Sequence, residues 1–448
     1  MKPSRYNIYC YQDDNIYVVN ILNNSYLKIN NDAINKSIID QLKNKNEVVN
    51  SEINSEIVQK LYSHNFILDN ESNEDDRIRE LINSEYDTQD VLKLTIIPTL
   101  WCNFDCVYCY QDYEHLMMSE DVLNSIYKYI YLNINKYKVL DIGWFGGEPL
   151  CAQDIIINLM RKLSGLCFLK KKKLFGSMST NGYLLNSENF IQLYNSGVRG
   201  FQITLDGFAQ DHNRLRKLKN GGPTFDKIVN NLRFIKKNDQ YNDLRIIIRL
   251  NITKKSDTYM NEFIKYLSNE FSNDKRFHLD FQPVVDMGSN CMDKIKDDLI
   301  NDNFDINKYI ALAKEMGLNI YTPNIINRCG NICYAARNNN YYLFNYDGKV
   351  QKCTAKLNNE NNIIGQLNTN GEIELNENAV IWREIRNKKY DKCNECKYFP
   401  ACCSLSCPLS YIENHTPKCS PIFKKIDQDL LLKLINQNKG VTVYDYTK

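Results

Sequence analysis

Three cysteines lie within eight residues: Cys102, Cys106 and Cys109 of the segment TLWCNFDCVYCYQDYEH, residues 99–115. Thiols this close together are typical of a bound metal. A structural zinc site is one interpretation, because His115 would complete a set of three cysteines and one histidine. An iron-sulfur cluster is the other, since such clusters are held by thiolates and a set of three would leave one iron open. This segment alone leaves both interpretations open.

A second group of cysteines lies in the last third of the chain. It consists of Cys329, Cys333, Cys353, Cys393, Cys396, Cys402, Cys403, Cys407 and Cys419. The pairs Asp347-Gly348 and Asn370-Gly371 in this region predict tight hairpin turns. The region has little periodic apolar sequence, so bound metal would add the stability that it lacks. A zinc ribbon on the C-x2-C pair at 393–396 and two later cysteines is the alternative to a cluster.

The composition is that of an ordinary globular protein of 448 residues, long enough for two or three domains. Hydrophobic residues make up 43%, charged residues 25%, and the formal net charge is +2. No strong field would attract nucleic acid or acidic lipid. The first residues lack the apolar core of a signal peptide, and no run approaches the roughly 20 apolar residues of a membrane span. We therefore expect a cytoplasmic protein that binds neither nucleic acid nor a membrane.

In a reducing compartment, grouped cysteines indicate metal ligation rather than disulfides. Cys10, Cys151, Cys167 and Cys291 have no such grouping. We expect these four to be small buried hydrophobic residues.

The amino-terminal part predicts a small α+β domain with a winged-helix-like order. Residues 1–70 begin with alternating apolar and polar residues around a turn, continue with two helical stretches, and close with FILD. Residues 71–90 contain eight acidic and two basic residues. This charge indicates a solvated linker or an exposed helix, and hence a domain boundary.

Residues 91–320 alternate short β-rich runs with amphipathic stretches. The predicted strands are 91–98, 139–145, 173–179, 200–205, 244–251 and 277–283. Repeated β-α units predict a parallel sheet with right-handed crossovers, either an open doubly wound sheet or a partial barrel.

The residues that could do chemistry follow these strands. The cysteine triplet follows the first strand, the segments 146–149 (GGEP) and 179–182 (STNG) follow the next two, and 206–207 (DG) follows the fourth. Arg249 and Asn251 end the fifth. Because active sites in parallel sheets and barrels form where the βα loops meet, we expect one site at this edge.

The order of these motifs over residues 92–285 resembles the radical S-adenosylmethionine (SAM) enzymes. In that family the three cysteines hold a 4Fe-4S cluster whose open iron binds the amino and carboxylate groups of SAM. Reduction then yields a 5'-deoxyadenosyl radical that removes a hydrogen atom from the substrate. The resemblance implies a partial (β/α)6 barrel of TIM type. It also implies that His115 is not a metal ligand.

The same resemblance implies which residues contact SAM. The glycines of the GGEP motif lack a Cβ, so their backbone could approach the methionine amino group closely. Hydroxyl and amide groups of the STNG motif would reach the ribose, and an arginine would lie near the carboxylate. The implied contacts are Gly146, Gly147, Glu148, Ser179, Thr180, Asn181 and Arg216.

The carboxyl-terminal cysteines resemble the SPASM extension of this superfamily, which holds two auxiliary 4Fe-4S clusters. The resemblance implies Cys329, Cys333, Cys353 and Cys407 for the first cluster. It implies Cys393, Cys396, Cys402 and Cys419 for the second. The spacing departs from the pattern, so Cys403 could replace Cys402, although the context KYFPAC favours Cys402. The implied domains are a core at 91–320, a SPASM domain at 321–425, and a helix and tail at 426–448.

SPASM enzymes mostly modify peptides, and the motifs resemble the maturases of ribosomally made peptides. The resemblance implies an oxidative cross-link, with a thioether favoured over a carbon-carbon bond. It implies two partners, a precursor peptide whose leader residues 1–70 would recognise and a flavodoxin- or ferredoxin-type electron donor. An anaerobic sulfatase maturase is the alternative enzyme, and an electron-transfer or zinc-scaffold protein is the non-enzymatic one. Asp286 is a possible acid-base residue, but no pattern identifies the catalytic group.

Overall fold

The structure is a computed structural model of the chain. It describes residues 1–448 except 46–54, 88–89, 110, 112–113, 285–294, 301–303, 305, 322–328, 331, 338, 389, 420–422, 424–425, 427, 429–430, 433–441 and 448. The predictions for Asp286 and Cys291 therefore lie outside the described residues.

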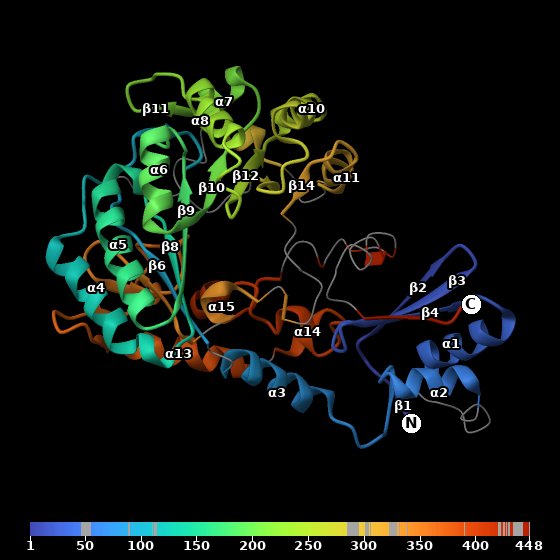
Figure 1. Ribbon diagram of the computed structural model, residues 1–448. Coiled ribbons are helices and arrows are strands. Elements are labelled where there is room, and N and C mark those ends of the chain that lie inside the picture. Colours follow the sequence, from blue (N-terminus) through green and yellow to red (C-terminus); the bar gives the residue numbers. More distant parts are fainter. Residues whose placement is uncertain are drawn as a thin grey trace. The chain divides into compact units, whose positions relative to one another are not determined.

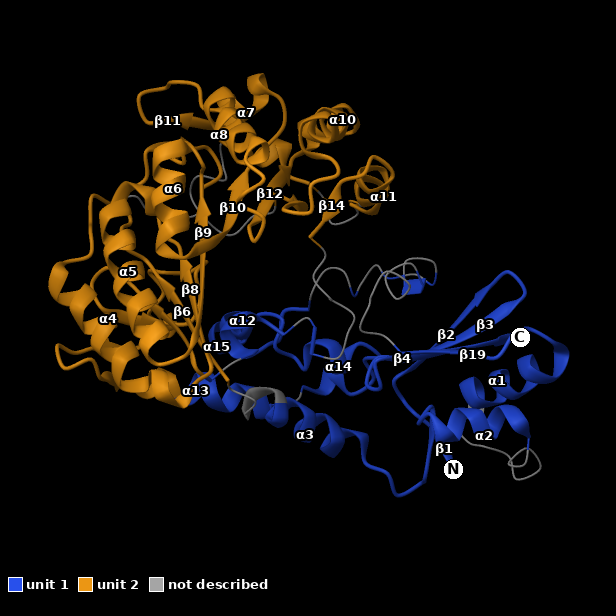
Figure 2. Ribbon diagram, viewed as in Figure 1, with its two compact units in different colours: residues 1–88, 323–339, 380–448 blue, residues 89–322, 340–379 orange. Residues whose placement is uncertain are grey.

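The chain divides into two compact units (Figure 2). The first consists of residues 1–88, 323–339 and 380–448, and the second of residues 89–322 and 340–379. The segment 340–379, which we predict as part of the cysteine-rich region, thus belongs to the second unit.

The second unit is built on an 11-stranded sheet. Its parallel part contains β6 (Val91–Ile96), β8 (Val139–Trp144), β9 (Lys173–Thr180), β10 (Val198–Thr204), β12 (Arg245–Ile252), β13 (Phe277–Pro283) and β14 (Asn319–Ile320). Neighbouring strands pair in parallel in the order in which they occur in the chain. All six strands predicted in this region are present, and their consecutive parallel order is that of a mixed α/β fold.

Helices follow these strands because their apolar residues recur at helical spacing. They are α4 (Glu120–Asn133), α5 (Gln153–Leu169), α6 (Ser187–Ser196), α7 (Ala209–Leu215), α8 (Phe225–Lys237), α9 (Lys254–Asp257), α10 (Met260–Phe271) and α11 (Asn307–Glu315). Helix α8 buries Ile228, Leu232 and Ile235 on one side, and each such side chain contributes about 1.5–3 kcal/mol when removed from water. Helices α4, α5 and α6 lie on one side of the parallel strands (Figure 1).

The sheet continues beyond β6 through two hairpins. β15 (Tyr341–Phe344) pairs in parallel with β6, and β16 (Lys349–Gln351), β17 (Ile363–Leu367) and β18 (Ile373–Leu375) follow in antiparallel order. Both predicted turns are present, because Gly348 and Gly371 have positive φ angles of 79° and 81°. The sequence predicted the hairpins, but not that they extend the core sheet.

The first unit begins with a small α+β sheet. β2 (Asn7–Gln12), β3 (Asn15–Asn20) and β4 (Ser25–Asn30) are antiparallel neighbours, followed by α1 (Ala33–Lys45) and α2 (Glu56–Ser63). β1 (Lys2–Pro3) pairs with β5 (Ile67–Leu68). The predicted α+β composition is therefore observed, while the winged-helix comparison stays a prediction.

The acidic segment 71–90 is the helix, and not the solvated linker, of the two predicted alternatives. It forms α3 (Glu74–Asp87), and Ile78 and Ile82 of this helix are buried in a core cluster. That cluster also contains Cys393, Cys403 and other residues of the cysteine-rich segment. The two isoleucines are four residues apart and share one helix face, while most other described side chains of the helix are exposed or partly exposed.

The carboxyl-terminal tail contains a strand that the sequence did not predict. β19 (Thr442–Asp445) pairs in parallel with β4 of the amino-terminal sheet. Most residues of the helix predicted after 426 lie outside the described part of the chain. The remaining described elements of the cysteine-rich segment are short: α12 (Tyr334–Arg337), α13 (Glu377–Glu384), α14 (Phe399–Cys402) and α15 (Pro408–Asn414).

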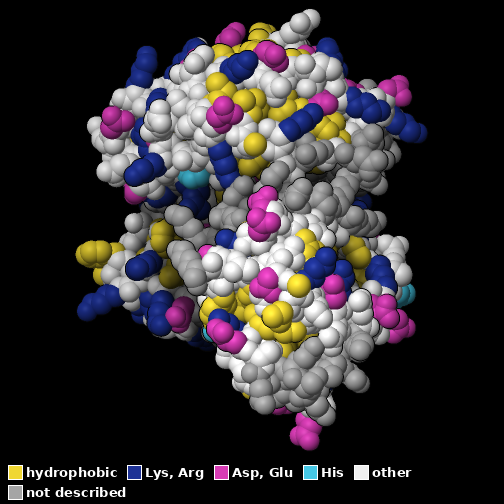
Figure 3. Space-filling view, turned by 90° about the vertical axis from the view of Figure 1, so that its right-hand side faces the viewer, with side chains coloured by type: hydrophobic (Ala, Val, Ile, Leu, Met, Phe, Trp, Pro, Cys, Tyr) yellow, Lys and Arg dark blue, Asp and Glu magenta, His cyan; other side chains and the backbone are white. Residues whose placement is uncertain are grey.

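The described helices include none that is both long and apolar enough to cross a lipid bilayer. On the face shown in Figure 3, basic and acidic side chains are interspersed rather than gathered in one patch. This distribution agrees with the small net charge of +2.

Candidate active site

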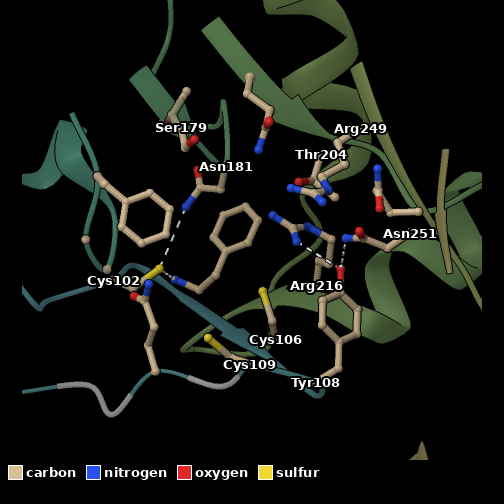
Figure 4. A pocket seen from close by; sticks show the side chains of 18 of the residues that line it. Cys102, Cys106, Tyr108, Cys109, Ser179, Asn181, Thr204, Arg216, Arg249 and Asn251 are labelled. Atoms are coloured by element: carbon tan, nitrogen blue, oxygen red, sulfur yellow. Dashed lines mark hydrogen bonds between the residues drawn. The ribbon is translucent and has the colours of Figure 1, made fainter. Parts of the chain in front are cut away.

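A cavity of about 460 Å³ lies among the loops that follow the parallel strands of the second unit. Its lining includes the cysteine triplet together with Gly146, Gly147, Ser179, Thr180, Asn181 and Arg216 (Figure 4). Gln202, Thr204, Arg249, Asn251 and Gln282 also line it. The structure thus brings together every predicted SAM contact except Glu148.

The cysteine loop is held in place by a small antiparallel ladder. β7 (Phe104–Cys106) pairs with β11 (Arg216–Leu218), which sets Cys106 opposite Arg216. Burial raises the pKa of the Cys106 thiol to about 12, while the Arg216 guanidinium acts in the opposite direction. Burial also raises the pKa of Cys102. Because the thiolate is the metal ligand, these thiols must lose their protons when a metal binds.

The glycine motif packs directly against the cysteine loop. A Cβ on Gly146 would lie 2.4 Å from the carbonyl oxygen of Thr99, and one on Gly147 would lie 2.4 Å from those of Leu100 and Trp101. Gly146 also has a φ of +130°. The missing side chains therefore make room for the backbone of the cysteine loop. The close approach of a ligand to these glycines, which the family resemblance implies, stays a prediction.

Glu148 is not among the residues that line the cavity, and its predicted contact with SAM stays a prediction. Its carboxylate is buried and accepts hydrogen bonds from Thr180 Oγ1 at 2.6 Å, Asn181 N at 2.6 Å and Leu150 N at 3.0 Å. Burial raises the pKa of Glu148, and these donors oppose that shift. Glu148 is a positioning residue that joins the loop after β8 to the loop after β9.

Asn181 connects the loop after β9 to the cysteine loop. Its Nδ2 donates to Asn103 Oδ1 at 2.7 Å and lies 3.9 Å from the Cys102 sulfur (Figure 4). The predicted Thr180 hydroxyl and Asn181 amide thus already bind groups of this chain. They fix the rim of the cavity around the first cysteine.

A buried polar network lies beside Cys106, and sequence reasoning missed its centre, Tyr108. The Tyr108 hydroxyl donates to the Asp206 carboxylate and accepts from Arg216 Nη1 at 2.9 Å and Asn251 Nδ2 at 3.1 Å. Asn251 N also donates to Asp206 Oδ1 at 3.2 Å. The aromatic residue before the third cysteine and the Asp206-Gly207 turn were visible in the sequence. Nothing there indicated that they share a hydrogen-bond network.

The network holds one positive charge beside the cavity. Burial disfavours the Arg216 charge, but Tyr108, Cys106 and Asp206 raise the pKa of Arg216 well above its usual value. Burial raises the pKa of Asp206, whereas Arg216 acts to lower it. Burial and Arg216 together lower the pKa of His212 well below its usual value. His212 is therefore neutral, and its Nδ1 accepts a hydrogen bond from Asp206 N at 3.2 Å.

A protein-family model matches the segment of the chain that contains most of the residues around this cavity. The model of the Radical SAM superfamily matches residues 96–267, which include the cysteine triplet, the glycine motif and Arg216. The chain contains a radical SAM domain. This match supports an enzyme, and it does not support the electron-transfer or zinc-scaffold alternative.

Curated relatives match part of the chain. An uncharacterized protein of Synechocystis is 28% identical over 152 residues, which are 33% of this chain and 38% of the relative. A serine-type anaerobic sulfatase-maturating enzyme of Bacteroides thetaiotaomicron is 24% identical over 199 residues, 41% of this chain and 44% of the relative. The chain thus spans about two fifths of the length of these two relatives.

A solved structure shares the fold over a longer span. The structure described as native anSMEcpe with bound AdoMet and Cp18Cys peptide covers 77% of this chain and 98% of its own, with 19% identity and a TM-score of 0.56. At this identity the likeness establishes the mixed α/β fold of the radical SAM domain.

The residues of the radical SAM domain fit the cofactors that the family implies, SAM and an iron-sulfur cluster. Three thiols from one loop border the cavity, whose volume is within the roughly 300–1,000 Å³ typical of small-molecule sites. The buried Arg216 adds a positive charge that suits thiolates or a carboxylate.

The zinc interpretation of the cysteine loop fits less well. His115, its fourth ligand, stacks on Trp101 with ring centroids 3.2 Å apart. In the described part of the chain, no three His, Cys, Asp or Glu side chains are arranged to hold a metal ion. A zinc ion needs all its ligand atoms within about 2.0–2.3 Å of one point. A four-iron cluster instead distributes its thiolates over separate irons.

The second cysteine group distinguishes Cys402 from its neighbour. Burial raises the pKa of Cys402 to about 12, and the Cys396 and Cys393 thiols act in the same direction. Cys419 likewise acts on Cys396. Cys403 lies in the same core cluster as Cys393, with its sulfur 3.7 Å from the Pro400 carbonyl oxygen. Cys402 is partly exposed and Cys403 is buried, and the choice of Cys402 as the ligand stays a prediction.

The first auxiliary set is divided between the units. Cys329 N donates to Pro400 O at 2.8 Å and Cys333 N to Leu405 O at 2.9 Å, which joins this pair to the cysteine-rich segment of the first unit. Cys407 belongs to the same unit, and Cys353 belongs to the second. This ligand set therefore stays a prediction. Cys10 and Cys167 are buried as expected, and Cys151 is partly buried.

Proposed function

We propose that this radical SAM enzyme is a peptide maturase that installs an oxidative cross-link in a ribosomally made precursor peptide. The proposal depends on one observation. The cysteine triplet, the glycine loop, the loop after β9 and Arg216 all line one cavity at the carboxyl ends of the strands. When bound, a 4Fe-4S cluster and SAM supply a 5'-deoxyadenosyl radical for hydrogen-atom removal.

The chain's own residues hold and orient these groups. Cys102, Cys106 and Cys109 would hold the cluster, and Glu148 and Asn181 fix the loops on either side of it. Arg216 presents a buried positive charge for the SAM carboxylate. Arg249 and Asn251 line the same cavity, where they can position a substrate backbone by hydrogen bonds.

The substrate class is supported by two observations. The similar fold of anSMEcpe has been solved with a peptide bound together with AdoMet, and residues 1–70 form the separate small sheet that we predict to recognise a leader. We propose a precursor peptide with a leader as the substrate. A flavodoxin- or ferredoxin-type protein would supply the electron that cleavage of SAM consumes.

The favoured bond is a thioether between a peptide cysteine and a carbon of another residue. Forming it breaks one C–H and one S–H bond and makes one C–S bond. One hydrogen leaves as an atom to the 5'-deoxyadenosyl radical, and the other leaves as a proton and an electron. An electron acceptor is therefore required. Auxiliary iron-sulfur clusters would supply such an acceptor, and the residues implied to hold them are Cys329, Cys333, Cys353 and Cys407 for one and Cys393, Cys396, Cys402 and Cys419 for the other.

The test is mass spectrometry of short cysteine-containing peptides encoded beside this protein, after anaerobic reaction. Each thioether should remove two hydrogens and one alkylatable thiol, and deuterium from the substrate should appear in 5'-deoxyadenosine. Loss of two hydrogens with every thiol still alkylatable would assign carbon-carbon coupling. No mass change in any peptide would contradict the proposal.

Sulfatase maturation is the second candidate, because curated relatives include anaerobic sulfatase-maturating enzymes. In that reaction a cysteine or serine of a sulfatase becomes an aldehyde. A hydrazine-reactive aldehyde on a co-incubated sulfatase-derived peptide, with 5'-deoxyadenosine formed in equal amount, would support it.

A further inference from the structure

The last described residues of the chain form an added strand on the amino-terminal sheet. β19 (Thr442–Asp445) pairs in parallel with β4, whereas the other strands of this sheet are antiparallel. Thr442 N donates to Asn24 O at 3.0 Å, and Tyr446 N donates to Lys28 O at 2.9 Å. The edge of β4 thus binds an extended segment through backbone hydrogen bonds.

Two tyrosines of the tail contact one histidine. Tyr444 stacks on His64 with ring centroids 3.6 Å apart, and the Tyr446 hydroxyl lies 2.7 Å from His64 Nε2. The Lys60 ammonium lies 4.1 Å from the centre of the Tyr446 ring. Alternate residues of an extended strand face the same side. The two rings therefore meet the end of α2 together and pack against the core of this sheet.

The rest of the tail strand faces solvent. Val443 is 52% exposed, and Thr442 and Asp445 are exposed. The Asp445 carboxylate lies 3.9 Å from the Lys28 ammonium. β4 itself is mostly buried. Removing β19 would therefore uncover two aromatic contacts and a strand edge, but little of the core.

We infer that the outer edge of β4, with His64 and Lys60, is a peptide-binding groove that the chain's own tail occupies until a precursor peptide replaces it. Strand addition supplies affinity through the backbone, and contacts to alternate side chains supply specificity. The fitting segment is extended and has an acidic residue between two aromatic ones. The identity of the displacing partner rests on the proposed function, whereas the groove rests on the contacts of the tail.

Because the tail belongs to the same chain, a partner peptide needs a minimum affinity to replace it. A segment linked to its own site competes at an effective concentration on the order of mM. A free peptide must bind tightly enough to overcome that competition. The tail would therefore exclude weakly matching peptides from the groove.

The experiment uses a fluorescent synthetic peptide with the sequence of residues 441–448, VTVYDYTK, and measures its binding by anisotropy. The full-length chain is compared with the full-length Tyr444→Ala/Tyr446→Ala double variant. Val443→Ala is the matched control, because this residue is in the same strand and exposed. We expect the double variant to bind the probe at least tenfold more tightly than either other chain, because its own tail no longer competes.

Two further measurements separate a groove from non-specific binding. His64→Ala added to the double variant should weaken probe binding at least tenfold, with an unchanged circular dichroism spectrum. A probe with both tyrosines replaced by alanine should not bind. Equal affinity of the three chains for the probe, or no binding to any of them, would show that β19 is a fixed structural strand and would overturn the inference.

If the double variant does not fold, hydrogen exchange of the unaltered chain gives the same information. Excess unlabelled VTVYDYTK should accelerate exchange of the Tyr446 amide, which donates to Lys28 O. Unchanged exchange would overturn the inference. These readouts need neither SAM nor turnover, so failure of the proposed reaction would not affect them. If the groove binds the probe but a precursor peptide does not displace it, the assignment of the partner is wrong.

Discussion

The two groups of thiols in this protein depend on different supports. Cys102, Cys106 and Cys109 lie on a loop that a parallel sheet and the β7–β11 ladder hold in place. Cys393, Cys396 and Cys402 lie among one-turn helices, and Cys393 belongs to a core cluster of the first unit. In the first case the fold positions the thiols. In the second case we expect the metal to stabilise the fold around it.

The hydrogen bonds of the two regions agree with this contrast. Around the triplet, Glu148, Asn181 and Arg216 bind backbone and side chains of neighbouring loops. Around the second group, the Ser404 hydroxyl lies 3.2 Å from the Cys393 sulfur, and most other bonds are local turns. Loss of the first cluster should therefore affect chemistry, and loss of the second should affect stability. The following predictions test that difference, beginning with the largest effect.

The largest effect is expected from Cys102→Ala. This change should reduce 5'-deoxyadenosine formation below detection and remove about four of the roughly twelve irons expected from three four-iron clusters. The melting temperature should change little, because the sheet holds the loop. Iron and sulfide assays, chromatography of the nucleoside and calorimetry check the three parts. Stoichiometric zinc without sulfide in the unaltered protein would contradict the cluster assignment.

The second prediction compares two adjacent cysteines. Cys402→Ala should remove about four irons and lower the melting temperature by about 5 °C or more, the shift that roughly 2 kcal/mol produces in a domain of 150–250 residues. Cys403→Ala is the matched control, because its sulfur packs in the core, and it should retain all iron. If Cys403→Ala loses about four irons and Cys402→Ala retains all of them, Cys403 is the ligand. Equal melting temperatures for Cys402→Ala and Cys102→Ala would remove the contrast between the regions.

A smaller effect is expected from Tyr108→Phe, which removes the hydroxyl shared by Asp206, Arg216 and Asn251. Leaving a buried donor unpaired costs about 1–3 kcal/mol, so SAM cleavage should fall roughly 10- to 100-fold while iron content is retained. Tyr183→Phe is the control, because its ring packs on Phe104 without lining the cavity. If Tyr108→Phe cleaves SAM at the unaltered rate, the network does not position Arg216.

The smallest effect concerns the ion pair of Asp274 and Arg276 in the second unit. This pair should form whether or not iron is bound. Burial by itself would raise the pKa of Asp274, but hydrogen bonds and charge from Arg276 lower it to about 2. A lowered carboxyl pKa stabilises the fold above the unfolded value of about 4, and this contribution is lost as the pH falls toward 2. Asp274→Asn should cost about 1–2 kcal/mol at pH 7 after allowance for solvent screening.

Denaturant unfolding of this variant at several pH values, with and without iron, provides the check. The stability difference from the unaltered protein should shrink below pH 4 and should not depend on iron. A difference that disappears on removal of iron would show that the second unit also depends on its cluster.

Much of the radical SAM domain was predictable from the sequence. The six strands of the parallel sheet were visible because their apolar residues alternate or run together between turns, and this local pattern survives in the fold. The triplet, GGEP and STNG motifs were placed at one edge because parallel strands all end there. The hairpin turns at Gly348 and Gly371 were predictable because positive φ angles favour glycine.

Other features depend on contacts between segments far apart in the chain. The acidic composition of residues 71–90 predicted a linker or an exposed helix, but only packing shows that Ile78 and Ile82 of this helix are buried in a core cluster. No local pattern indicated that the Glu148 carboxylate accepts hydrogen bonds from three donors on two loops. No local pattern shows that β15 joins β6 or that β19 joins β4, because strand pairing depends on which edges the rest of the fold leaves exposed.

The sequence by itself therefore determined the chemistry that this chain can carry: closely spaced thiols, small residues beside them, and a parallel sheet to hold both. The tertiary structure alone decided how these residues act. It placed the glycines against the cysteine backbone, centred a buried network on Tyr108, and turned Cys402 and Cys403 to different environments. Spacing along the chain limits which side chains can meet, but burial and hydrogen bonding between distant segments select the ones that do.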